Sequence, residues 1–160
     1  MPAARRNVWW LLVFLALPAM VCADAGGKGL ELEVHVAGAD GEALRTFTSG
    51  QSIHLGLELT NHGPEPLSLP FSSAKTFDAV VLSGDGTEVW RFSKGRMYAQ
   101  MLSQLELASG DSKVFEAACE SMESGVPALA PGRYEVVGII PAIGAELRSA
   151  PVAFTVAPAE

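Results

Sequence analysis

The chain has 160 residues, 49% of them hydrophobic, and its 18 acidic and 11 basic side chains give a formal net charge of −7. This length fits one domain that buries a sizeable core without needing a metal or a disulfide. The acidity argues against binding to nucleic acid, because such proteins neutralise phosphates with clustered Lys and Arg.

Residues 1–25 have the pattern of an export signal. Arg5 and Arg6 supply the charged start, residues 8–21 form an apolar run, and Ala23-Asp24-Ala25 fits a small-x-small cleavage site. We therefore expect a cleaved signal peptide, a mature chain that begins at Gly26, and a secreted or periplasmic location.

Three alternatives concern the same segment. Cleavage after Ala23 would make Asp24 the first residue of the mature chain. A retained membrane anchor is disfavoured, because the apolar run of 14 residues is shorter than the ~20 that a span needs. A lipid anchor on Cys22 is disfavoured because Met20 and Val21 stand where small residues are expected. After signal removal we expect no membrane association.

Alternation of apolar and polar residues dominates the chain after residue 30 and predicts one all-β domain over residues 26–160. In residues 30–36, Leu and Val alternate with Glu and His, which is typical of a half-buried strand. Further strands are predicted at 53–59, 67–71, 77–82, 88–92, 113–119, 133–140 and 150–156. Such short strands with one apolar face favour an antiparallel immunoglobulin-like β-sandwich, in which two apolar faces pack together.

The segment from Phe77 to Gln100 carries the most specific pattern of the chain. Ser83-Gly84-Asp85-Gly86 predicts the tight turn of a β-hairpin, and the returning strand carries Trp90. Residues 96–102 fit either one helical turn or an edge segment, and residues 120–130 form the least regular loop.

These positions resemble the BsuPI domain family, the family of the Bacillus intracellular proteinase inhibitor. The resemblance extends over about residues 30–156, the length of one domain. The matching positions are Asn61, Phe71-Ser72, Phe77-Asp78, Asp85-Gly86, Val89–Ser93, Gln100, Ser109–Ser112 and Pro131–Tyr134. Ala79 and Cys119 depart from the pattern, where the family tends to have an aromatic residue and Trp. The resemblance implies a protein without catalytic activity that inhibits a serine proteinase, with a subtilisin-like enzyme as the expected partner.

The candidate partner-binding residues lie at the end of the hairpin and in the turn that follows: Trp90, Arg91, Lys94, Gly95, Arg96 and Met97. The three cations concentrate positive charge on an otherwise acidic chain, and Gly95 permits a protruding turn. Two interpretations of Trp90 stay open, a core anchor or a partner-facing contact, since Trp and Arg dominate binding hot spots. The cations equally fit ordinary solvated turn residues.

No sequence pattern predicts a catalytic site, a cofactor or a metal site. Ser72-Ser73-Ala74-Lys75 has the S-x-x-K spacing of some acyl-transfer enzymes, but the companion motifs are missing and a strand precedes it. The three histidines lack the spacing of metal ligands. His35 and His54 fall on the polar faces of their strands and are expected to be exposed.

Cys119 is the single cysteine of the chain if Cys22 leaves with the signal, which excludes an intramolecular disulfide. It shares one strand face with Phe115 and Ala117, so we expect a buried thiol. An intermolecular disulfide or a reactive thiol is the alternative.

The sequence and the resemblance together predict an exported proteinase inhibitor that acts by protein–protein binding. The competing hypothesis is an immunoglobulin-like binding or accessory module of the cell envelope that inhibits nothing. Both hypotheses predict an accessible loop, and under both the protein is not an enzyme.

Overall fold

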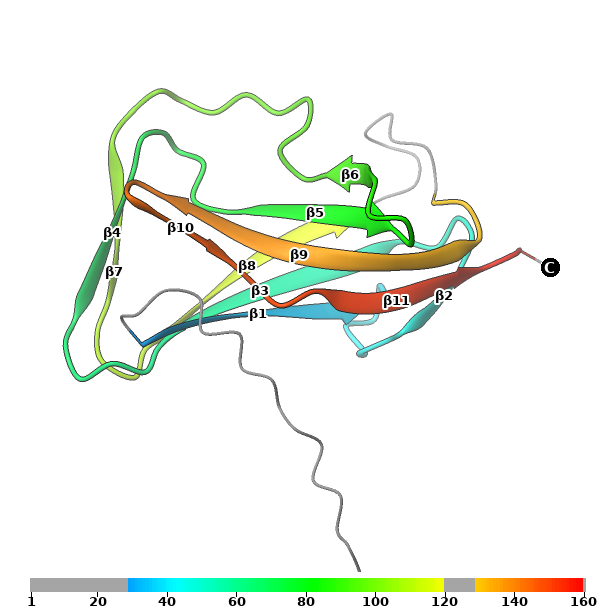
Figure 1. Cartoon of the computed structure of the whole chain (residues 1–160), viewed down its shortest axis with the longest axis horizontal. Coiled ribbons are helices and arrows are strands. Elements are labelled where there is room, and N and C mark those ends of the chain that lie inside the picture. The colour runs from blue at the N-terminus through cyan, green and yellow to red at the C-terminus, as the bar shows by residue number, and fades with distance from the viewer. Residues whose placement is uncertain (1–28, 120–128, 160) are drawn as a thin grey trace, which may run out of the picture.

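The computed structural model describes residues 29–119 and 129–159, and every regular element in these ranges is a β-strand (Figure 1). The strands are β1 (Leu30–Ala37), β2 (Thr46–Thr48), β3 (Ile53–Asn61), β4 (Leu67–Phe71), β5 (Asp78–Ser83), β6 (Glu88–Arg91), β7 (Ser103–Leu107), β8 (Ser112–Cys119), β9 (Gly132–Ala142), β10 (Ala145–Arg148) and β11 (Val152–Ala157). The predicted strands correspond to β1, β3, β4, β5, β6, β8, β9 and β11. The short strands β2, β7 and β10 are additional.

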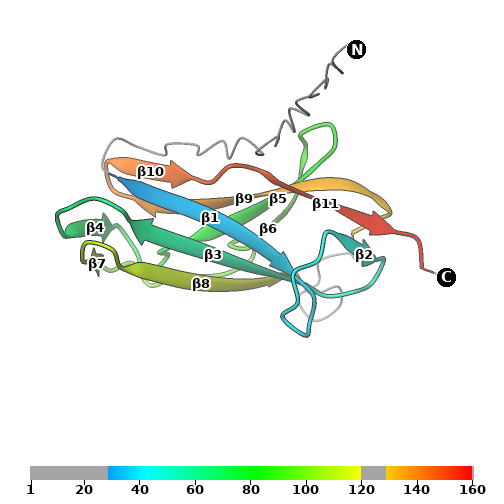
Figure 2. The same ribbon diagram turned by 90° about the horizontal axis from the view of Figure 1, so that it is seen from below.

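The strands form three sheets. One has the order β1-β3-β8, the largest runs β2-β11-β9-β5-β6 with β10 added to β9, and the smallest pairs β4 with β7. The pairings are antiparallel except that of β11 with β2. Figures 1 and 2 show the first two sheets as two layers, with the β4-β7 pair at one end. The predicted all-β, largely antiparallel class is confirmed.

The core lies between the two layers, where the apolar faces of their strands meet. On β3 the inward side chains Leu55, Leu57 and Leu59 are at most 1% exposed. Gly138 of β9 marks a close approach, because a Cβ there would lie 2.8 Å from Val34 and 2.9 Å from Leu57. A larger residue at position 138 would therefore press the layers apart.

Tyr134 ties β9 to the segment that precedes it. Its hydroxyl donates a hydrogen bond of 2.7 Å to the carbonyl of Ala130, four residues upstream. The ring stacks on Phe154 of the neighbouring strand β11, with centroids 5.6 Å apart. This pair anchors one end of the large sheet.

The predicted hairpin is confirmed as β5 and β6, which pair Val80 with Arg91 and Val81 with Trp90. Its turn places Gly86 at a φ of 84°, a conformation that favours glycine. The prediction of a helical turn at residues 96–102 is wrong, because these residues form no regular element. Instead, the carbonyl of Ala99 accepts a hydrogen bond from the N–H of Ala74, so this segment lies beside the loop that follows β4.

Several sequence expectations fall outside the described residues. They are the signal peptide at residues 1–25, the alternatives for Cys22, and residues 120–128 of the irregular loop. Within the two described ranges, no helix is long and apolar enough to cross a membrane.

Candidate functional site

The indole of Trp90 belongs to the core. Trp90 is 6% exposed, and its ring lies 6.4 Å from that of Phe92 at a tilt of 56°. Alternation along β6 turns this side chain inward while Val89 and Arg91 face outward. The core interpretation therefore holds, and the exposed candidate surface does not include the indole.

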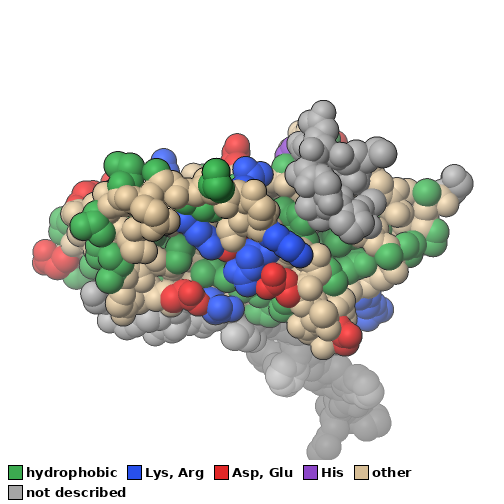
Figure 3. All heavy atoms as spheres, turned by 90° about the horizontal axis from the view of Figure 1, so that it is seen from above, with side chains coloured by type: hydrophobic (Ala, Val, Ile, Leu, Met, Phe, Trp, Pro, Cys, Tyr) green, Lys and Arg blue, Asp and Glu red, His purple; other side chains and the backbone are tan. Residues whose placement is uncertain are grey.

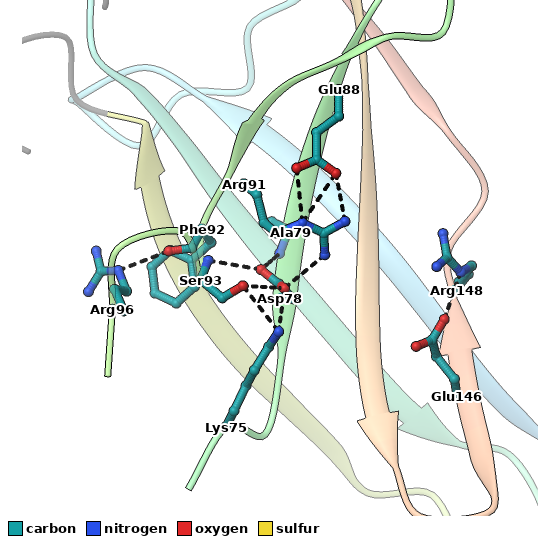
Figure 4. A network of polar contacts seen from close by, with 10 residues as sticks. All are labelled: Lys75, Asp78, Ala79, Glu88, Arg91, Phe92, Ser93, Arg96, Glu146 and Arg148. Carbon is teal, nitrogen blue, oxygen red and sulfur yellow. Dashed lines mark hydrogen bonds and ion pairs between the residues drawn. The ribbon is translucent and has the colours of Figure 1, made fainter. Parts of the chain in front are cut away.

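Arg91 is held by two carboxylates on the outer face of the hairpin. Its guanidinium lies 2.7 Å from Glu88 and 3.1 Å from Asp78 (Figure 4). The hydrogen bonds that Arg91 donates to Glu88 are the main cause of both shifts: they raise the pKa of Arg91 and lower the pKa of Glu88. Arg91 therefore forms ion pairs within the domain, and its guanidinium is already bound to Asp78 and Glu88.

Asp78, at the start of β5, is the centre of this arrangement and is buried. Oδ2 accepts hydrogen bonds from Lys75 Nζ at 2.6 Å, Ser93 Oγ at 2.7 Å and Arg91 Nη1 at 3.1 Å. Oδ1 accepts from the backbone N–H groups of Ala79 and Ser93, each at 3.0 Å. We call Lys75, Asp78, Glu88, Arg91 and Ser93 the Asp78 network.

Two opposing effects act on the pKa of Asp78. Burial raises it, but the hydrogen bonds from Lys75, Ser93 and Arg91 outweigh burial and hold the pKa below its ordinary value of 3.8. Asp78 is therefore a carboxylate at neutral pH. Because Ser93 donates to both of its oxygens, this charge fixes the point where the chain leaves the hairpin.

Residues Ser93–Met97, which we call the basic turn, follow directly. The N–H of Lys94 donates to Arg91 and that of Arg96 donates to Ser93, each over 3.2 Å, and Gly95 has a φ of 77°. Lys94, Gly95 and Arg96 are exposed, and Met97 is 98% exposed. The structure thus places four of the six candidate residues together on the surface.

Arg96 packs back against the hairpin. Its guanidinium lies 4.1 Å from the centroid of the Phe92 ring, and its Nε donates to the Phe92 carbonyl at 3.0 Å. Such cation–π contacts stabilise the side chain over the ring. The basic turn is therefore held at both Ser93 and Arg96.

The face around the basic turn is positively charged. It carries Lys75, Arg91, Lys94 and Arg96 against the carboxylates of Asp78 and Glu88, an excess of two positive charges. Figure 3 shows Lys and Arg side chains gathered near the middle of this face. Because the whole chain has a net charge of −7, the face stands out electrostatically.

A groove of about 560 Å³ borders the basic turn. Phe92 and Arg96 form part of its wall, and the rest comes from β1, β3, β8 and the loop after β1. His35, Gly56 and Glu116 lie side by side across its floor, as the strand registers show. The small Gly56 leaves the sheet surface low at this point.

The lysine of the S-x-x-K spacing has a structural role. Lys75 Nζ donates hydrogen bonds to Asp78 and Ser93, so the S-x-x-K spacing does not form a Ser–Lys pair with Ser72.

Cys119 is buried, as expected, and burial raises its pKa to about 11, which keeps the thiol protonated. His35 is exposed and His54 half-buried. Residues 29–119 and 129–159 hold no cluster of three His, Cys, Asp or Glu suited to a metal ion.

The sequence did not reveal the roles of Asp78 and Lys75. One signal was present, since an Asp followed directly by the apolar run of a strand must either be exposed or find partners. Its partners come from 3 and 13 to 15 residues away, and only the hairpin register brings them together.

The fold and the site define the class of protein: a β-domain with an exposed basic turn that hydrogen bonds fix beside its hairpin. The family model named BsuPI, described as intracellular proteinase inhibitor, matches residues 42–144, and the chain belongs to this family. The family resemblance is thereby confirmed, and it indicates a proteinase inhibitor with a protein partner. The matched range includes the Asp78 network and the basic turn.

No curated protein matches the chain. Among solved structures, the C-terminal domain of wzt is similar with a TM-score of 0.55 and 15% identity over 84% of this chain and 77% of that chain. The Pseudomonas fluorescens alkylpurine DNA glycosylase AlkC matches with a TM-score of 0.46 and 15% identity over 81% of this chain and 31% of its own. At 15% identity the likeness to the wzt domain concerns the fold alone.

Proposed function

We propose that this protein is an exported inhibitor of a serine proteinase that acts by binding, and that the basic turn enters the proteinase cleft. The observation that carries the proposal is the exposed turn of a BsuPI family member, fixed at its base by a buried carboxylate. A subtilisin-like enzyme is the expected target.

Bracing matters because ordering a loop on binding costs free energy. A turn that already holds its bound shape loses less conformational freedom when it docks. Ser93 and Arg96 supply such restraint from within the domain. Main-chain hydrogen bonds between the turn and the cleft would then contribute affinity, and exposed side chains would set selectivity.

The finer fold assignment and the export belong to the same proposal. Two packed, largely antiparallel layers and the Tyr134 hydrogen bond to Ala130 support an immunoglobulin-like sandwich, since a tyrosine corner of this kind recurs in that fold. Export is supported by the Arg5-Arg6 charge, the apolar run and the cleavage pattern of residues 23–25. An exported inhibitor would meet proteinases outside the cytoplasm.

The test is a panel of serine proteinases. The purified protein is titrated into subtilisin-like, chymotrypsin-like and trypsin-like enzymes, and residual activity is measured on small chromogenic substrates. We expect at least one enzyme to be inhibited stoichiometrically while the protein stays intact by mass. Unchanged activity of every enzyme, or rapid digestion of the protein, would contradict the proposal.

The second candidate function is a binding or accessory module of the envelope without inhibitory activity. The groove of about 560 Å³ favours it, because a concave surface is the usual place for a bound ligand. The two candidates separate on the location of the contact, since the module would bind through the groove and leave the proteinase panel active.

A further inference from the structure

We propose that Met97 fills the primary specificity pocket of the target, so that the inhibited proteinase has an apolar pocket and is not trypsin-like. This inference rests on the proposed function and adds the class of enzyme that the domain binds. The complex is non-covalent, with the Met97 side chain taking the place of a substrate side chain.

Met97 is the most exposed large apolar residue of the described chain, at 98%. Its neighbours behave differently, because the guanidinium of Arg96 lies on the Phe92 ring and Tyr98 is half-buried. The Met97 side chain is thus free, while that of Arg96 packs on the hairpin and that of Tyr98 is partly covered. A fully exposed apolar side chain between such neighbours has the arrangement of a residue that enters a partner's pocket.

Both sides of Met97 are fastened to the domain. Upstream, Asp78 holds Ser93 and the Phe92 carbonyl holds Arg96. Downstream, the carbonyl of Ala99 accepts hydrogen bonds of 3.0 Å from the N–H groups of Ala74 and Met101. The segment is therefore presented as a short span between two fixed points.

The main chain at this span has free hydrogen-bonding groups. Among the described residues, neither the N–H nor the C=O of Met97 or Tyr98 makes a hydrogen bond. Peptides recognised in an extended form use such groups to pair with the edge of a partner. Positions 97 and 98 are therefore suited to lie along a cleft as a substrate does.

The two basic side chains nearby fit a trypsin-like pocket less well. Lys94 sits inside a tight turn, with its N–H bonded to Arg91 and Gly95 at a positive φ, so its main chain cannot extend along a cleft. Arg96 would have to give up its contact with the Phe92 ring and its bond to the Phe92 carbonyl. Met97 would give up neither, and its unbranched thioether adapts to varied apolar pockets.

The experiment compares inhibition constants of the wild-type chain, Met97→Lys, Met97→Leu and the control Met101→Lys. Met101 lies on the same segment and is 58% exposed, so its replacement adds the same charge without touching position 97. Each variant is measured against subtilisin, chymotrypsin and trypsin, and the denaturation midpoint verifies its folding. Because Met97 is 98% exposed, replacing its side chain should not destabilise the domain.

We expect the wild type to inhibit an apolar-pocket enzyme and Met97→Lys to weaken this by about 30-fold or more, as for a binding hot spot. Inhibition of trypsin should rise in the same variant, Met97→Leu should stay near wild type, and Met101→Lys should change little. Wild-type inhibition that Met97→Lys leaves unaltered, or inhibition of trypsin alone, would overturn the inference and keep the proposed function. No inhibition of any enzyme by the wild type would reject both.

Discussion

At the scale of single residues, Asp78 decides how the hairpin and the basic turn are joined. It is 1% exposed, yet five donor groups reach its two oxygens. A buried carboxylate is costly unless its lone pairs are satisfied, and here the satisfaction comes from the residues that shape the candidate site. The same carboxylate thus contributes to stability and to the position of Ser93.

Replacing Asp78 with Asn removes the charge but keeps the shape, and it leaves Lys75 and Arg91 without their buried partner. We expect the free energy of unfolding at pH 7 to fall by about 2 to 4 kcal/mol, somewhat reduced because both cations reach water. Urea denaturation measures it. Glu146→Gln, which breaks the exposed pair with Arg148 at 2.9 Å, is the control and should cost under about 1 kcal/mol.

The pH dependence of this variant supplies its second readout. Because the folded pKa of Asp78 is lowered, its contribution is full above 3.8 and is lost as the pH falls through the lower folded value. Wild-type stability should therefore drop more steeply than that of Asp78→Asn as the pH falls from about 3.8 through the lower folded pKa of Asp78. If the stabilities of the two proteins fell in parallel at acidic pH, the protonation of Asp78 would not account for the loss.

At the scale of elements, the hairpin places the basic turn on the surface. The alternation of apolar residues predicted β5 and β6, and the turn residues predicted their connection. The sequence could not show which cation meets which carboxylate, since the pairing of Val80 with Arg91 depends on the register. Likewise β2 is only three residues long and β10 four, so neither repeats the alternation often enough to be recognised.

Reversing the charges of Lys94 and Arg96 to Glu tests the electrostatic part of the site. We expect weaker inhibition that depends less on salt, because positive charge near a cleft attracts an acidic rim and salt screens that attraction. Inhibition constants at low and moderate salt measure it. Lys113→Glu with Arg133→Glu changes the net charge equally at exposed positions on β8 and β9, and should not alter the constants as much. Equal effects of both pairs would assign the change to net charge alone.

At the scale of the whole molecule, an acidic domain carries one basic face, and two layers of sheet support it. The class of fold was predictable because period-2 alternation recurs along the chain. The sequence also identified the charged turn and offered the core position of Trp90, which the packing of β6 confirms. It did not single out Met97 as the most exposed large apolar side chain of the described residues.

The export proposal predicts a shorter mature protein. Cleavage before Gly26 or Asp24 should remove the charged and apolar start of the chain, so the intact mass of protein recovered outside the cytoplasm identifies the first residue. Replacing Ala23 and Ala25 with bulky residues should block processing. Recovery of the chain with Met1 retained, or with acyl groups on Cys22, would contradict this expectation.

The most direct measurement is hydrogen exchange of the protein alone and in complex with a serine proteinase whose catalytic serine is blocked. The main-chain N–H groups of Met97 and Tyr98 make no hydrogen bond within the described residues, so they should exchange quickly in the free protein. We expect strong protection on binding at residues 93–101 and none on the outer face of β1, β3 and β8. Protection of the groove instead, with residues 93–101 still exchanging freely, would contradict it.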